Sequence, residues 1–73
     1  MKPGINYINK RFIKRLIKLR KAKGYNAEKL AFASGMSPNG YRYIERGDRE
    51  PKLISLAMSA GGLGIILSKL LDL

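Results

Sequence analysis

Apolar side chains recur along residues 10–23 at the spacing of one face of an α-helix. Phe12, Leu16 and Leu19 lie three or four positions apart, and lysines and arginines occupy most of the positions between them. An apolar stripe with a charged remainder is typical of an amphipathic helix. The pattern therefore predicts a first helix over residues 10–23, which Gly24 ends.

Turn-forming residues divide the next part of the chain into two shorter helices. Asn26 is a good N-cap for a second helix, and Gly35 suits the left-handed residue that ends one. Ser37 and Pro38 predict the start of a third helix, because serine caps first-turn N–H groups and proline has no N–H to leave unpaired. Gly47 marks the end of this third helix.

The remaining residues are more apolar and less regular. Pro51 suits the beginning of a fourth helix, and glycines are expected to break it. The expected core stripe of this helix is Leu53, Leu56, Ala57 and Ala60, and the expected breaks are Gly61, Gly62 and Gly64. Residues 65–71 then predict a short, very apolar final helix.

The chain has 73 residues, which is enough for one small domain. We expect residues 1–7 to form a partly disordered N-terminal tail, because Pro3 and Gly4 interrupt any firm pattern there. Residues 8–73 are expected to form one all-α domain. No repeat or linker divides it.

Charge narrows the function classes. Fifteen Lys and Arg against five Asp and Glu give a net charge of +10, which attracts a polyanion such as nucleic acid or an anionic membrane surface. Cys and His are absent, and the five carboxylates are scattered. We therefore expect no enzyme, no metal, no cofactor and no small-molecule ligand. The apolar runs are too short to cross a bilayer, so we expect a cytoplasmic protein with no membrane span.

Several spaced motifs together resemble one family. The frame consists of "LRKAKGYNAEKLA", "SGMS" and "YIERGDREP", followed by a leucine-rich end. It resembles the helix-turn-helix domain of the XRE family, which includes the Cro and phage-repressor domains. The resemblance implies a compact five-helix, lambda-repressor-like fold whose helix 37–46 lies in the major groove of DNA.

The resemblance also implies roles for individual residues. Base reading would fall to Pro38, Asn39, Gly40, Arg42 and Tyr43. Phosphate binding would fall to Asn26, Ser37, Arg46, Arg49 and Lys52. Arg20 and Glu45 would form a structural ion pair that orients the third helix. Asn39 suits a bidentate pair with adenine, although it would equally stabilise the first turn of its helix.

The apolar C-terminal residues predict a homodimer. They exceed what so small a core should hide, and family relatives often pair through their last helix. The expected interface residues are Ile54, Met58, Ile65, Ile66 and Leu70. The alternative is that these residues fold back onto a second stripe of the first helix, at Ile13 and Ile17.

These inferences favour a sequence-specific, DNA-binding transcriptional regulator that acts as a homodimer on a palindromic operator. The size resembles restriction–modification controller proteins, stand-alone phage regulators and some antitoxins. One alternative is an antitoxin-type protein-interaction module for which DNA binding is secondary. Another is a basic protein that binds membrane surfaces through its first helix.

Overall fold

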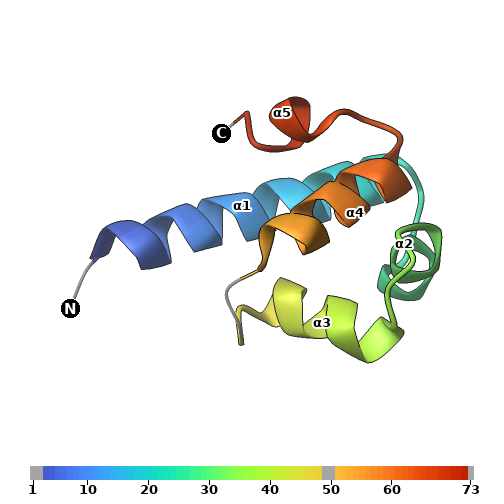
Figure 1. Ribbon diagram of the computed structural model, residues 1–73, viewed down its shortest axis with the longest axis horizontal. Helices are drawn as coiled ribbons and strands as arrows, with labels where there is room; N and C mark the ends of the chain where they lie inside the picture. Colours follow the sequence, from blue (N-terminus) through green and yellow to red (C-terminus); the bar gives the residue numbers. More distant parts are fainter. Residues whose placement is uncertain (1–2, 49–50, 73) are drawn as a thin grey trace.

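Five helices make up the part of the chain that the computed structural model describes, residues 3–48 and 51–72 (Figure 1). Side chains are described from Lys10 onward, apart from the gap at 49–50. The helices are α1 (Pro3–Ala22), α2 (Ala27–Ala33), α3 (Pro38–Arg46), α4 (Leu53–Leu63) and α5 (Leu67–Leu70). The prediction of an all-α, five-helix domain is confirmed.

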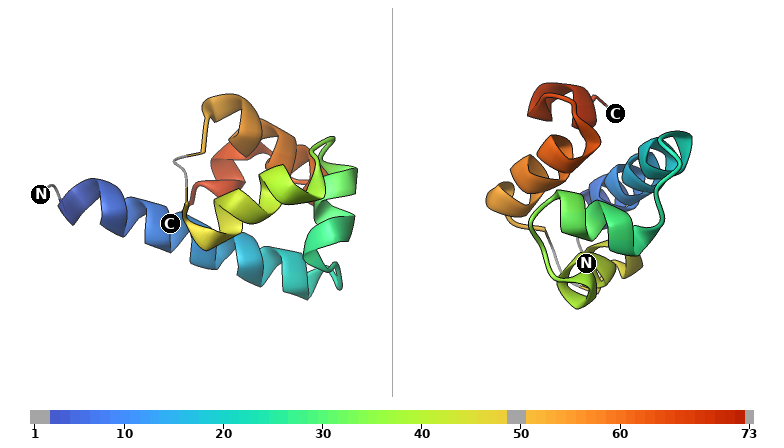
Figure 2. Two further views of the ribbon diagram at one scale, coloured as in Figure 1. Left: turned by 90° about the horizontal axis from the view of Figure 1, so that it is seen from below. Right: turned by 90° about the vertical axis from the view of Figure 1, so that its right-hand side faces the viewer.

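The long helix α1 runs the length of the molecule, and the other four helices surround one side of it. Helix α3 lies on one flank of α1 and α5 on the other, as both figures show (Figures 1 and 2). All five helices contribute apolar side chains to a single core. The core residues are Phe12, Leu16, Leu30, Ala31, Tyr41, Ile44, Ala60, Leu63 and Leu70.

The helix boundaries around α2 and α3 follow the expected local chemistry. The Oδ1 of Asn26 accepts a hydrogen bond from the N–H of Lys29 at 2.7 Å. The Oγ of Ser37 accepts one from the N–H of Gly40 at 3.1 Å. Each bond satisfies an N–H group that the first turn of a helix leaves unpaired. The predicted caps are confirmed.

The beginning of α1 differs from the expectation. The helix starts at Pro3, so residues 3–7 belong to it and do not form the predicted tail. Proline fits the first turn of a helix because its φ is already helical and its missing N–H would have had no partner. The prediction for Met1 and Lys2 lies outside the described residues.

The interior of α4 also differs. The helix continues through Gly61 and Gly62 and ends at Gly64, whose φ is +74°. Gly62 is buried where α4 meets the end of α2, and a Cβ added there would lie 2.2 Å from Ser34 Oγ and 3.0 Å from Ser34 N. Gly62 therefore permits close packing of two helices and does not break one.

The buried face of α4 matches the predicted stripe only in part. Ala60 is buried and Leu56 packs against the core, as predicted, whereas Leu53 and Ala57 are exposed. The prediction missed Ser59 and Leu63, which are buried. The hydroxyl of Ser59 donates to the carbonyl of Ser55 at 2.9 Å, so its burial leaves no unpaired hydroxyl.

The short helix α5 is tied to α1 by Arg15. The Nε of Arg15 donates to the carbonyl of Leu70 at 3.1 Å, and its Nη2 donates to the carbonyl of Lys69 at 2.8 Å. The side chain of Leu70 is fully buried in the core. The placement of Leu70 in a dimer interface is therefore corrected, because the monomer already covers it.

Candidate nucleic-acid interface

Helix α3 presents one anchored face and one exposed face. Tyr41 and Ile44 are buried, while Asn39 and Arg42 are exposed. At about 100° per residue, Asn39 and Arg42 project away from the side that Tyr41 and Ile44 occupy. A partner that approaches α3 from outside the bundle therefore meets an amide and a guanidinium.

A polar cluster fixes the anchored face against α1. The Nε of Arg20 lies 2.7 Å from Glu45 Oε2, and Nη2 lies 3.4 Å from Oε1. The hydroxyl of the buried Tyr41 donates to the same Glu45 Oε2. Both side chains of the ion pair are largely buried, with 12% and 14% of their surfaces exposed. The structure thus contains the Arg20–Glu45 pair that the resemblance implied.

The cluster extends to the turn before α2 and perturbs two pKa values. The Nη1 of Arg20 donates to the carbonyl of Tyr25 at 2.8 Å. Burial, together with the hydrogen bond to Glu45, raises the pKa of Tyr41 well above its ordinary value. Burial opposes the charge of Arg20, but the hydrogen bond to Glu45, the negative charge of Glu45 and the contribution of Tyr41 together outweigh burial, so the pKa of Arg20 is raised. Tyr41 therefore remains a neutral donor and Arg20 remains charged.

The other base-reading candidates lie along the same helix. Pro38 is half-buried at the first position of α3. Gly40 is also half-buried, and a Cβ added there would lie 3.0 Å from the capping Oγ of Ser37. The glycine thus has a local structural reason, which the sequence interpretation missed. Tyr43 is half-buried, and the guanidinium of Arg46 lies 5.2 Å from the centre of its ring.

The phosphate-binding candidates differ in their exposure and in the contacts that they already make. Asn26, Ser37 and Lys52 are exposed, and the amide nitrogen of Asn26 stays available because its oxygen makes the cap. Arg46 is exposed but forms an ion pair with Asp48, with Nε and Oδ2 3.0 Å apart. Arg49 lies outside the described residues.

A shallow groove separates α3 from α4 and brings candidates from both helices together. Ser37, Gly40 and Tyr43 line one side of it, and Lys52 lies on the other. The remaining lining residues are Met36, Ile44, Pro51, Ser55 and Met58. The groove therefore brings the base-reading candidates Gly40 and Tyr43 beside the phosphate-binding candidates Ser37 and Lys52.

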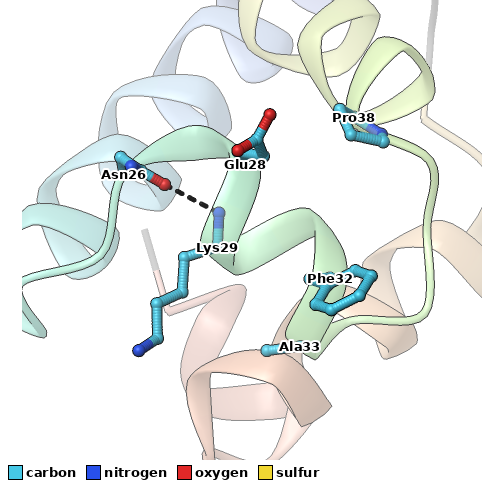
Figure 3. Close-up of a pocket in the computed structure, with 6 residues that line it drawn as sticks. All are labelled: Asn26, Glu28, Lys29, Phe32, Ala33 and Pro38. Atoms are coloured by element: carbon cyan, nitrogen blue, oxygen red, sulfur yellow. Dashed lines mark hydrogen bonds between the residues drawn. The ribbon is translucent and has the colours of Figure 1, made fainter.

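A second hollow lies between α2 and the start of α3, and both polar and apolar side chains line it (Figure 3). Asn26, Glu28 and Lys29 contribute polar groups, and the dashed line marks the cap between the Asn26 side chain and the Lys29 backbone. Phe32, which is 86% exposed, is drawn toward the end of α2. The sequence interpretation did not identify Phe32, because a lone aromatic residue on a short helix is usually assigned to the core.

Two further interactions escaped the sequence interpretation. Tyr41 and Glu45 are four residues apart on one helix, and this spacing was the available signal for their hydrogen bond. The contact between Arg15 and α5 had no comparable signal, because its partners are backbone carbonyls more than fifty residues away. Local spacing therefore reveals only contacts within an element.

The expected dimer residues fall into three groups. Ile54 and Ile66 are 63% and 71% exposed, Met58 and Ile65 are half-buried, and Leu70 is buried. Leu53, beside Ile54, is also exposed. Ile13 packs against the core, which agrees with the alternative that the C-terminal residues fold back onto the first helix.

In the part of the chain that is described, no helix combines the length and apolar character needed to cross a membrane.

Comparisons with known proteins agree with this geometry. The profile of the helix-turn-helix family matches residues 16–65. The restriction–modification controller protein C.AhdI from Aeromonas hydrophila is 39% identical, with a TM-score of 0.75 over 81% of this chain and 89% of that one. The clp gene regulator ClgR from C. glutamicum is 30% identical, with a TM-score of 0.77 over 88% of this chain and 83% of that one. No curated protein matches.

Proposed function

Because the chain belongs to the XRE-type helix-turn-helix family, we propose that it is a sequence-specific DNA-binding transcriptional regulator. Helix α3 enters the major groove, and α2 crosses the adjacent backbone. A controller and a gene regulator are among the similar structures, which supports regulation as the outcome of binding. We place its action in the cytoplasm, where it meets DNA.

The exposed face of α3, held by its buried polar cluster, is the observation that carries the proposal. Base readout requires side chains placed to within a fraction of an ångström, so the helix that carries them must be fixed. Arg20 and Tyr41 both bind Glu45 from the buried side, which leaves Asn39 and Arg42 outward. An amide pairs with adenine and a guanidinium with guanine in the major groove.

The surrounding residues position the helix and carry no sequence information of their own. The exposed Asn26, Ser37 and Lys52 donate to phosphates, and Arg49 joins them in this proposal. Arg46 serves the same role once its ion pair with Asp48 has broken, because an exposed ion pair contributes little stability. Tyr43, one turn from Asn39, contacts a base edge or a thymine methyl group.

We further propose that the regulator binds as a homodimer. Leu53, Ile54 and Ile66 expose large apolar surface that a second copy would bury. A two-fold dimer places two copies of α3 on successive turns of one face of DNA, so the operator would be palindromic with half-sites about 10 base pairs apart.

In vitro selection from random duplex DNA, followed by fluorescence anisotropy, tests the proposal. The selection should return a palindrome with that half-site spacing. Asn39→Ala should lower affinity for the selected duplex by about 1–3 kcal/mol and leave binding to random DNA nearly unchanged, because base contacts carry the sequence information.

Lys52→Ala is the matched control. It should weaken binding to both duplexes alike and flatten the salt dependence by about one unit, because a phosphate contact is blind to sequence. Equal losses on both duplexes for Asn39→Ala would remove Asn39 from base reading. A selection that enriches no sequence would contradict sequence-specific regulation.

A further inference from the structure

Four lysines form a ridge along α1 that the proposed α3 interface does not use. Lys10, Lys14, Lys18 and Lys21 follow one another at intervals of four, four and three residues, and all four are exposed. At about 100° per residue they fall within one narrow arc of the helix, over about 16 Å of its length. We call these four residues the lysine ridge.

The lysine ridge lies on the side of α1 opposite the core. Phe12 and Leu16 place the buried side of α1 about half a turn from the ridge. Arg20 turns toward α3 on one flank, and Arg15 turns toward α5 on the other. Figure 2 (right) shows α1 at the edge of the bundle, with the other helices to one side of it.

Helix stability does not account for the ridge. Like charges three or four residues apart destabilise a helix, and α1 contains no Asp or Glu to offset them. The helix dipole favours a cation only in the last turn, which explains Lys21 but not Lys10, Lys14 or Lys18. Within the described residues, the ion pairs are Arg20–Glu45 and Arg46–Asp48, so none of the ridge lysines has a carboxylate partner.

One carboxylate lies near the ridge without neutralising it. Asp72 shares a hollow with Lys14 and Lys18 and with two arginines, Arg11 and Arg15. The hollow therefore remains strongly cationic, and the ridge continues beyond it to Lys10 and Lys21. A surface of this kind fits a regular, closely spaced array of negative charge.

We propose that the lysine ridge binds the phosphate backbone of a second DNA duplex while α3 holds the first. The inference rests on the proposed function for the first duplex only. A duplex carries one negative charge per about 1.7 Å of its axis, so it meets all four lysines at once. We expect a duplex seated on the exposed face of α3 to leave the ridge accessible, because Arg20, which turns toward α3, lies about a third of a turn around α1 from the centre of the ridge.

A bridging experiment tests this assignment. The duplex recovered by selection is immobilised on beads, loaded with protein, and then offered a fluorescent duplex of random sequence. Wild-type protein should retain the fluorescent duplex. Four phosphate contacts predict that this retention falls about a hundredfold between 50 and 200 mM salt.

Two variants separate the ridge from α3. Substituting all four lysines by Gln should leave binding to the immobilised duplex within about twofold and lower retention of the second duplex by at least about tenfold. Substituting all four by Arg should restore retention, because it restores the charge. Circular dichroism should show that both variants fold, since every substituted side chain is exposed.

The outcomes distinguish this inference from the proposed function. Retention that persists in the Gln variant would overturn the ridge and assign bridging to a second copy of α3. Normal binding to the first duplex with no retention of the second would overturn the ridge and leave the regulator intact. Capture of anionic phosphatidylserine vesicles, but not of duplex, would assign the ridge to a membrane surface. Absence of binding to either duplex would overturn both proposals.

Discussion

Helices α2 and α3 begin differently from α4 and α5. Asn26 and Ser37 each cap a first turn with a side-chain oxygen, whereas Lys52 and Ile66 stand at the same position of α4 and α5 without a side-chain hydrogen bond. The first pair of helices is thus specified by residues adjacent to its own boundaries. The second pair depends on contacts with distant parts of the chain.

This difference distinguishes α2 and α3, which form the proposed DNA-reading unit, from α4 and α5. Caps hold α2 and α3 locally, and one polar cluster then orients α3 on α1. Helix α4 instead fits closely against α2 through Gly62, and α5 is held from outside by Arg15. Substitutions in the two regions should therefore destabilise the protein for different physical reasons.

The largest expected loss of stability comes from a substitution in α3, at the contact between Glu45 and Arg20 of α1. Glu45→Gln removes the carboxylate that pairs with Arg20 and leaves a largely buried guanidinium without its counter-charge. The free energy of unfolding should fall by about 3–5 kcal/mol. Urea unfolding followed by circular dichroism measures it.

Asp48→Asn supplies the matched control, because it removes the acid of the exposed pair with Arg46. Its effect should stay within about 1 kcal/mol. Similar losses for the two variants would mean that burial does not distinguish the two pairs.

The next effect tests the close packing of α4. Gly62→Ala forces a methyl group against Ser34, including its backbone nitrogen, and should lower stability by about 1–3 kcal/mol. Gly61→Ala, one position away, meets no atom within 4 Å and should raise stability by about 0.5–1 kcal/mol. Thermal unfolding of both variants decides the matter. A stabilised Gly62→Ala would show that α4 can move away from α2.

The smallest effects compare the caps directly. Ser37→Ala should lower stability by about 1 kcal/mol, because the N–H of Gly40 loses its acceptor. Lys52→Ser should raise it by about 0.5–1 kcal/mol, because it gives α4 the cap that it lacks. Chemical denaturation measures both. If neither value changes, local caps do not account for the contrast between the two pairs.

The same contrast explains which parts of the fold the sequence could predict. Helix boundaries could be predicted at Asn26, Ser37 and Gly47, because N-caps and a left-handed glycine act on residues close by in the sequence. Those boundaries agree with the structure. Gly62 was misassigned because its role depends on Ser34, which lies on another element. Leu70 was misassigned for the same reason, since only tertiary packing decides whether an apolar residue is covered.

The candidate site follows the same rule. The positions of Asn39 and Arg42 on an exposed face followed from helical spacing, whereas their DNA-contacting roles remain predictions. Arg20 and Glu45 were paired through resemblance to a family, because no local pattern connects residues 25 positions apart. Phe32 and the groove between α3 and α4 had to be found in the structure.

The hydrogen bonds from Arg15 have a consequence for the order in which the protein folds. Their acceptors lie 54 and 55 residues later in the chain, so this contact closes a loop of more than fifty residues. During synthesis, α1 leaves the ribosome before α2 and α3, yet it acquires this partner only after α5 has been made, when α2 and α3 have been able to form their local caps. Contacts of such long sequence separation slow folding, so the docking of α5 on α1 is expected to be a late step.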